Sequence, residues 1–226
     1  MRRILSRWSI YELIWLGLFC GTAIGITVIS KDTLFGFTVF LTGVLCVLLA
    51  AKGSLMTYVF GMYNTFGYAY LAYGNGLYGE VMLNLLFFVP MNVIGFVMWK
   101  NHREEGKVVM KQMSGKSLLG VAAISAFGSL ALGFALSFIP SQNSPYIDAL
   151  TTVLSVMATF LMVRRYKEQW LLYIVLNLFT VVLWVIRLLD GSPDGALMIV
   201  MWSAYLINAL YGYYTWNKGA KEAVAS

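Results

Sequence analysis

The chain has 226 residues, of which 60% are hydrophobic and 12% are charged, and its mean hydropathy is +0.75. Soluble domains carry about 25% charged residues, so this composition excludes an ordinary soluble domain and indicates a protein that crosses a membrane several times. The net charge of +6 is concentrated in a few short segments, which argues for membrane topology and against nucleic-acid binding.

Apolar runs of 18 residues or more recur along the chain, and each is long enough to cross about 30 Å of hydrocarbon as a helix. We predict eight spanning helices at about 10–29, 33–51, 55–73, 79–99, 118–139, 146–163, 170–189 and 196–216. Glu12 interrupts the first run, and no small-x-small cleavage site follows it. We therefore interpret this run as a span and not as a signal peptide.

The distribution of lysine and arginine predicts the orientation. With the N-terminus in the cytoplasm, fourteen basic residues fall in inner segments and only Lys31 and Arg187 fall on the outer side. Such an excess is typical of cytoplasmic loops, and a missed or extra helix would scramble the alternation. The pattern therefore predicts eight crossings with both termini in the cytoplasm.

Two stretches of the sequence look like copies of one another. Each contains two apolar spans with one asparagine at mid-span, Asn64 and Asn92 in the first stretch and Asn177 and Asn208 in the second. Asn64 and Asn177 are 113 residues apart and Asn92 and Asn208 are 116 apart, a drift that the longer turn of the second stretch explains. We interpret this pattern as an internal duplication.

The predicted fold is an all-α polytopic membrane protein with an extra N-terminal helix, then two parallel three-helix bundles joined by one linker helix. A single linker span places both bundles the same way up. The predicted parts are a basic head with the first span (1–32), the first repeat (33–99), an inner loop with the linker helix (100–145), the second repeat (146–217) and a cytoplasmic tail (218–226).

Polar side chains within the spans are the candidate binding residues. An amide in hydrocarbon is costly without a partner, so the mid-span asparagines are expected to point inward. In the seventh span Trp170, Asn177 and Trp184 are seven residues apart on one stripe, with Tyr173 beside them. The aligned positions of the first repeat carry Asn64 but no tryptophan. This asymmetric lining suits a ligand with one hydroxylated end and one flat ring.

Two plainer interpretations remain open. A single intramembrane asparagine often joins helices, and tryptophan near a span end often anchors at the interface. Every Asp and Glu lies at a span end or in a loop, which disfavours proton or sodium coupling. Hydrolase and phosphate-binding motifs are missing, so we expect no catalytic residues, cofactor or metal site. Pro90 is expected to kink the fourth span near Asn92.

Three segments of the sequence are distinctive: YGNGLYGE, NLLFFVPMNVIGFVMWKNHR and NLFTVVLWVIRLLDGSPDGALMIVMWSAYLINALYGYYTW. They resemble the PnuC family of bacterial nicotinamide riboside transporters, and the likeness extends over about residues 33–218. The family is similar to SWEET sugar transporters in its two parallel three-helix bundles. The resemblance implies a homotrimer in the bacterial inner membrane that takes up nicotinamide riboside by facilitated diffusion, with intracellular phosphorylation trapping the product.

The residues fit that substrate. Its cationic ring favours aromatic faces, while its ribose hydroxyls and carboxamide need neutral donors and acceptors. The predicted substrate-binding residues are Asn64, Asn92, Gln169, Trp170, Tyr173, Asn177, Trp184, Tyr205 and Asn208. The alternatives are another vitamin, such as thiamine or riboflavin, or a sugar. From a different class, a membrane receptor or scaffold would use the asparagines only to join helices.

Overall fold

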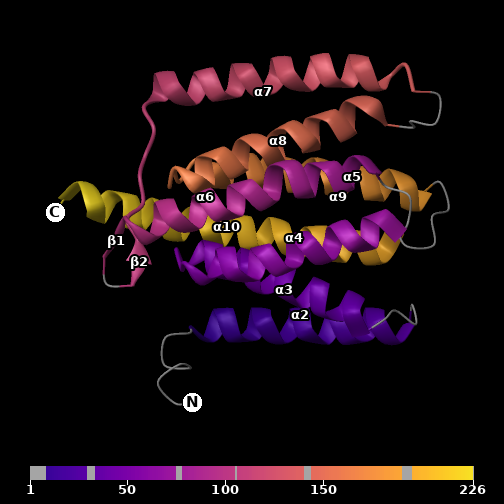
Figure 1. Cartoon of the computed structure of the whole chain (residues 1–226), viewed down its shortest axis with the longest axis horizontal. Coiled ribbons are helices and arrows are strands. Elements are labelled where there is room, and N and C mark those ends of the chain that lie inside the picture. The colour runs from indigo at the N-terminus through magenta and orange to yellow at the C-terminus, as the bar shows by residue number, and fades with distance from the viewer. Residues whose placement is uncertain are drawn as a thin grey trace. The chain divides into compact units, whose positions relative to one another are not determined.

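The computed structural model describes residues 9–29, 34–74, 78–104, 106–139, 144–189 and 195–225, which are helical apart from one short hairpin and the turns (Figure 1). The chain divides into two compact units, Met1–Asn101 (unit 1) and His102–Ser226 (unit 2). The predicted basic head with Arg2, Arg3 and Arg7, and the predicted outer Lys31, lie outside the described residues.

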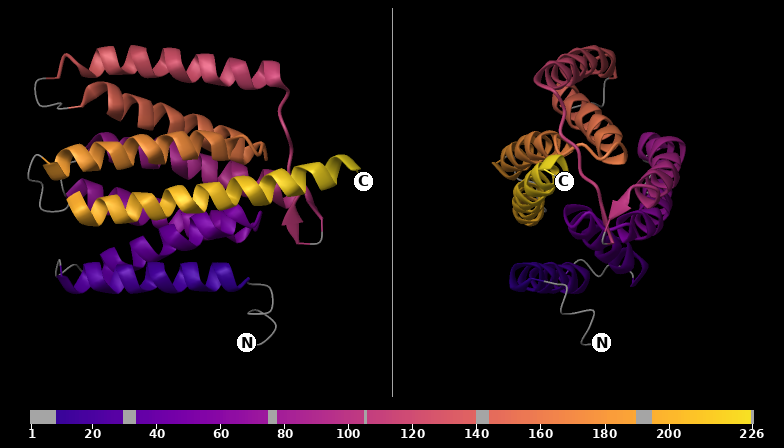
Figure 2. Two further views of the ribbon diagram at one scale, coloured as in Figure 1. Left: turned by 180° about the vertical axis from the view of Figure 1, so that it is seen from behind. Right: turned by 90° about the vertical axis from the view of Figure 1, so that its left-hand side faces the viewer.

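Unit 1 is a bundle whose middle helix packs against both neighbours. Its helices are α2 (Ile10–Ile29), α3 (Leu34–Ala51), α4 (Met56–Gly74), α5 (Tyr78–Met82), the π-helix η1 (Leu83–Phe88) and α6 (Val89–Lys100). Helix α4 contacts α3 on one side and α5, η1 and α6 on the other, while α2 lies alongside α3 (Figure 2). The last three segments together make one long span with an irregular middle.

Unit 2 repeats this arrangement. Its elements are β1 (Arg103–Glu104), β2 (Lys107–Val108), α7 (Gly115–Leu136), α8 (Pro145–Val163), α9 (Gln169–Leu189) and α10 (Gly195–Ala225). Helix α9 packs between α8 and α10, and α7 lies alongside α8 as α2 lies alongside α3. The core contains Val121, Leu154, Ala158, Leu161, Leu172 and Leu176, with Tyr173 and Trp202 packed against it.

Each predicted span contains an observed helix, which confirms the helical membrane-protein class. Within the part of the chain that the structure describes, five helices are long and apolar enough to cross a membrane: α3, the α5–η1–α6 helix, α7, α8 and α9. Helices α4 and α10 are less apolar because tyrosine, asparagine and threonine interrupt them. The last helix also continues beyond the predicted end at Trp216 to Ala225, so most of the predicted tail is helical.

Directly before Pro90, where we predicted a kink, the structure has a π-helical stretch. Six residues, Leu83–Phe88, adopt the wider π conformation directly before α6, and the Val89 N–H donates to the Asn84 carbonyl five residues back. Proline has no N–H and its ring crowds the preceding turn, so a wider turn relieves the clash and keeps the helix continuous.

The charged loop between the two predicted repeats forms a hairpin. The hairpin is followed by an extended segment, residues 109–114, which we call the strap. Strands β1 and β2 pair antiparallel, and Lys111 then forms a parallel bridge with Tyr166 in the α8–α9 turn. Two backbone bonds hold the strap, Lys111 N–H to the Arg165 carbonyl at 2.7 Å and Lys167 N–H to the Lys111 carbonyl at 2.9 Å. The buried side chain of Met110 packs on Gly219 of α10. The loop therefore fastens the end of unit 2.

A buried ion pair fastens α2 to unit 1. The Glu12 carboxylate accepts the Ser9 N–H at 2.7 Å and lies 2.8 Å from Lys52 Nζ, and Glu12 is only 4% exposed. We expect Glu12→Gln to lower the free energy of unfolding by about 3 kcal/mol, because glutamine keeps the helix-capping bond but removes the negative charge that faces the largely buried Lys52 ammonium. Thermal unfolding in detergent measures this change. Equal stability with an unchanged α2 would contradict a stabilising pair.

Candidate functional site

The turns that precede the middle helices, α4 and α9, show which residues of the two repeats correspond to each other. Gly53 and Arg165 both adopt positive φ, 67° and 68°. In each turn that residue's N–H donates three residues back, and the next N–H donates five residues back, at 2.9–3.0 Å. This is the Schellman pattern that ends a helix. Gly53 therefore corresponds to Arg165, although left-handed backbone is less favourable for arginine than for glycine.

The same register matches two aromatic clusters. Each consists of an aromatic ring, a glycine and a tryptophan: Tyr58–Gly95–Trp99 in unit 1 and Trp170–Gly212–Trp216 in unit 2. The ring centroids of Tyr58 and Trp99 are 4.9 Å apart, and those of Trp170 and Trp216 are 6.3 Å apart. The prediction that the aromatic residue occurs in one repeat only is therefore wrong at Trp170, whose ring packs α9 onto α10.

The register also corrects the asparagine alignment. Counting from Gly53 and Arg165, the counterpart of Asn177 is Thr65 and not Asn64. One residue along a helix is a rotation of about 100°, so Asn64 and Asn177 face different directions. The Asn64 Nδ2 donates to the Val39 carbonyl of α3 at 2.7 Å and packs on Gly43. Asn64 thus joins α4 to α3.

Asn92 of α6 is bound to the residue that corresponds to Asn177. Its Nδ2 donates to Thr65 Oγ1 at 3.2 Å and to the Phe88 carbonyl at 2.9 Å. Its Oδ1 lies close to Gly61, where any side chain would displace it. Thr65 was missed by the sequence analysis because its hydroxyl is unremarkable in a span. The useful signal is the spacing of Gly61, Thr65 and Ala72 along one face of α4.

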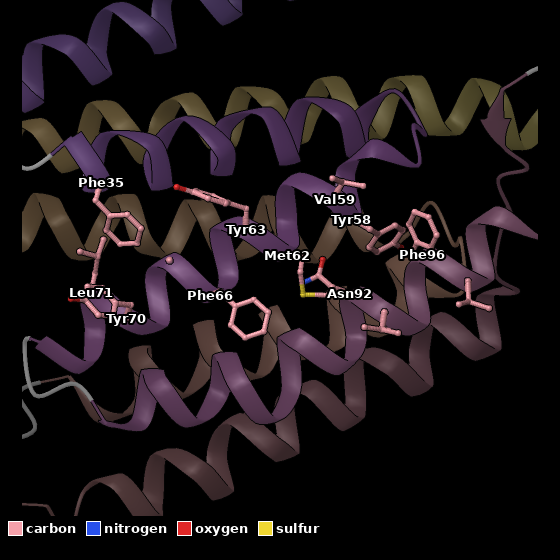
Figure 3. A pocket seen from close by; sticks show the side chains of 13 residues that line it. Phe35, Tyr58, Val59, Met62, Tyr63, Phe66, Tyr70, Leu71, Asn92 and Phe96 are labelled. Carbon is pink, nitrogen blue, oxygen red and sulfur yellow. The ribbon is translucent and has the colours of Figure 1, made fainter.

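An aromatic groove of about 1200 Å³ runs along unit 1 (Figure 3). Asn92 is the only predicted binding residue that lines it. Most of the other lining residues are aromatic or aliphatic, and none of those that the structure describes is charged: Phe35, Tyr58, Val59, Met62, Tyr63, Phe66, Gly67, Tyr70, Leu71, Val93, Phe96 and Val97. A groove of this kind offers ring faces and one amide.

Helix α9 presents a stripe of larger side chains. Tyr173, Asn177, Thr180 and Trp184 follow one another at helical spacing, and Asn177 is 5% exposed. Among the described residues, no group is hydrogen-bonded to the Asn177 amide. The counterpart positions in α4 are Gly61, Thr65, Tyr68 and Ala72. At both ends of the stripe, an aromatic residue of α9 thus corresponds to a small residue of α4: Tyr173 to Gly61 and Trp184 to Ala72.

The remaining predicted residues also lie in unit 2. Tyr205 and Asn208 are three residues apart on α10, and Asn208 is 2% exposed. Gln169 begins α9 and is fully buried, and neither its Oε1 nor its Nε2 has a hydrogen-bond partner among the described residues. A buried amide without partners is costly, so Gln169 is available to bind a ligand or water.

The cationic end of unit 2 lies at the strap. Arg165 is 3% exposed, its Nη1 donates to the Val109 carbonyl at 3.3 Å, and burial lowers the pKa of its guanidinium. Lys167 Nζ donates to Asn217 Oδ1 at 2.6 Å, which joins the α8–α9 turn to α10. Arg165 thus binds a backbone carbonyl and Lys167 binds a side chain of α10, so the described contacts of both cations are structural.

Comparison with known proteins places this arrangement in a family. A family model described as "Nicotinamide mononucleotide transporter" matches residues 33–218. The nicotinamide riboside transporter PnuC of Neisseria mucosa is 35% identical over 98% of this chain and 86% of its own length. The protein of the same name from Haemophilus influenzae is 34% identical over 98% of this chain and 96% of its own. The chain belongs to the PnuC family.

A solved PnuC structure supports the same conclusion for the fold. The crystal structure of a vitamin B3 transporter PnuC superposes with a TM-score of 0.80 at 34% identity, covering 98% of this chain and 96% of that one. PnuC proteins are membrane transporters and not enzymes, which confirms two predictions from the sequence.

Proposed function

We propose that this PnuC protein transports nicotinamide riboside. The observation that carries the proposal is the α9 stripe, where the buried amide of Asn177 lies between Tyr173 and Trp184. Aromatic faces attract a cationic pyridinium ring, and an amide can both donate to and accept from a carboxamide or a ribose hydroxyl. The relatives from Neisseria and Haemophilus carry the name of this substrate.

The same chemistry favours the riboside over the mononucleotide. The family description names the mononucleotide, whereas the named relatives are riboside transporters. A phosphate is usually bound by arginine, lysine or several N–H donors. The α9 stripe and the described lining of the unit 1 groove contain no lysine or arginine. Arg187 is the one cation in this part of α9, and its side chain lies outside the described residues.

The binding residues we propose are the remaining amides and rings of the predicted set, although Tyr173 also packs against the unit 2 core and Asn92 is bonded to Thr65. They are Asn92, Gln169, Tyr173, Asn177, Trp184, Tyr205 and Asn208, with Thr65 holding the Asn92 amide. Asn64 and Trp170 are assigned to helix packing by their contacts with Val39 and Gly212. The proposed site is therefore smaller than the set predicted from the sequence.

The proposal includes the finer architecture. Eight crossings in a 1+3+1+3 order, with both termini in the cytoplasm of a bacterial inner membrane, fit the observed helices and the basic residues. Uptake is by facilitated diffusion, because every Asp and Glu of the sequence lies at a span end or in a loop. Net uptake then needs phosphorylation inside the cell. The homotrimer rests on the family resemblance alone.

Transport by purified protein in liposomes tests the proposal. We expect liposomes that contain the protein to equilibrate radiolabelled nicotinamide riboside without an ion gradient, and to exclude nicotinamide mononucleotide. Empty liposomes are the control. Equilibration of thiamine or riboflavin in place of the riboside would show that the protein transports that vitamin instead. Tight binding with no equilibration would favour a receptor.

A further inference from the structure

We propose that Glu80 and Tyr68 form a receiving site for the cationic ring of the substrate at the predicted outer end of unit 1. This inference rests on the proposed function, because it assumes a positively charged substrate. Neither residue belongs to the substrate-binding set predicted from the sequence, and Glu80 would add a negative charge to a pathway otherwise lined by amides and rings.

Tyr68 belongs to the face of α4 that carries the counterparts of the α9 stripe. It follows Thr65 by three residues and corresponds to Thr180 in the other repeat. Tyr68 is 42% exposed as a residue, whereas Thr65 is 7% exposed. Tyr68 therefore places an accessible aromatic surface one turn beyond the position where Thr65 holds Asn92.

Glu80 supplies the negative charge beside this ring. It lies in α5, the short helix that packs on α4, the helix of Tyr68. The side chain is half-buried, and among the described residues no lysine or arginine forms an ion pair with it. A half-buried carboxylate without a cation is costly, and a cationic ligand would remove that cost.

The hydrogen bond that the structure shows at Glu80 of α5 does not involve its carboxylate. The backbone carbonyl of Glu80 accepts the Asn84 Nδ2 at 2.8 Å, and Asn84 is buried. A change confined to the carboxylate leaves this bond in place. The charge of Glu80 can therefore be removed by Glu80→Gln without removing a contact that the structure shows to hold α5.

The test compares a charged and an uncharged form of the same molecule. Nicotinamide riboside carries a positive pyridinium, whereas its dihydro form has the same size and ribose but no charge. We expect Glu80→Gln to raise the KM for uptake of the riboside about three- to tenfold and to leave uptake of the dihydro form unchanged. Tyr68→Leu should weaken riboside uptake about threefold, and Tyr68→Phe should keep it near the wild-type value.

Glu222→Gln is the matched control, since Glu222 forms only an exposed pair with Lys218 in the last helix. Equal uptake by Glu80→Gln and Glu222→Gln would overturn the proposal. A Glu80→Gln variant that loses both forms of the riboside equally would overturn it too, because the role would then be structural. A wild-type protein that takes up neither form would instead contradict the transport proposal, so the two failures differ.

Discussion

Asn177→Ala is expected to reduce nicotinamide riboside binding at least about 30-fold while the protein stays folded, because the amide is buried and makes its proposed hydrogen bonds to the ligand. Its removal breaks no bond to a described protein group, so the free energy of unfolding should change by less than about 1 kcal/mol. Isothermal titration of the detergent-purified protein measures binding, and a thermal melt of the same sample measures stability.

Asn64→Ala is the matched control with the opposite expectation. Its amide donates to the Val39 carbonyl at 2.7 Å and joins α4 to α3, so its loss should destabilise the protein by about 1 kcal/mol. Riboside affinity should stay within about threefold of the wild type, because this amide is already bonded to the backbone. If both variants lost stability and kept binding, the asparagines would only join helices and the proposed site would be wrong.

Gly212→Ala is expected to destabilise unit 2 by about 2 kcal/mol, since a methyl group at this position would lie 2.6 Å from ring atoms of Trp170. The ring is 3% exposed and packed against Trp216, so it has little room to move. The measurement is the midpoint of thermal unfolding, with tryptophan fluorescence reporting whether the environment of the ring changes.

Gly120→Ala is the control within the same unit. Gly120 lies in α7 with no side-chain atom within 4 Å of an added methyl group, and alanine is the better helix former by about 1 kcal/mol. This variant should therefore be slightly more stable than the wild type. A Gly212→Ala protein with an unchanged melting midpoint would show that the Trp170 ring moves freely, and the assignment of Trp170 to helix packing would lose its support.

The sequence predicted the helical class well because the length of a membrane span depends on the bilayer alone. Each of the eight predicted spans contains a helix, and five of these helices, counted over the described residues, are long and apolar enough to cross a membrane. Membrane thickness sets the length of an apolar run, and the excess of basic residues sets its direction. Neither signal needs a tertiary contact, so both can be taken from a single chain.

The register of the repeats could not be predicted in the same way. Aligning Asn64 with Asn177 is natural from residue type, but the equivalent backbone turns are at Gly53 and Arg165. A glycine and an arginine share no side-chain chemistry, and only their positive φ reveals the match. The alignment was therefore displaced by one residue. As a result, Asn64, which joins two helices, was predicted to contact the ligand, and Thr65 was not recognised as the counterpart of Asn177.

The irregular features also lay beyond a sequence argument. Pro90 predicted a kink, but whether the helix breaks or widens depends on neighbouring packing, and here Leu83–Phe88 widen. The charged segment after α6 has no period that predicts strands, yet it pairs through Lys111 with the α8–α9 turn. A contact of this kind joins residues far apart in the chain, and composition carries no information about it.

Both middle helices are fastened at the end where they begin. The turn before α4 is held through Lys52 by α2, and the turn before α9 is held by the strap at Lys111. If such a helix tilts about its fastened end, each residue moves in proportion to its distance from that end. Helix α9 has 21 residues and is about 30 Å long. A tilt of a few degrees would therefore leave the fastened ends almost still and shift the far ends by ångströms. We expect spin labels placed at the far ends of α4 and α9 to report substrate-dependent distance changes that labels beside the two turns do not.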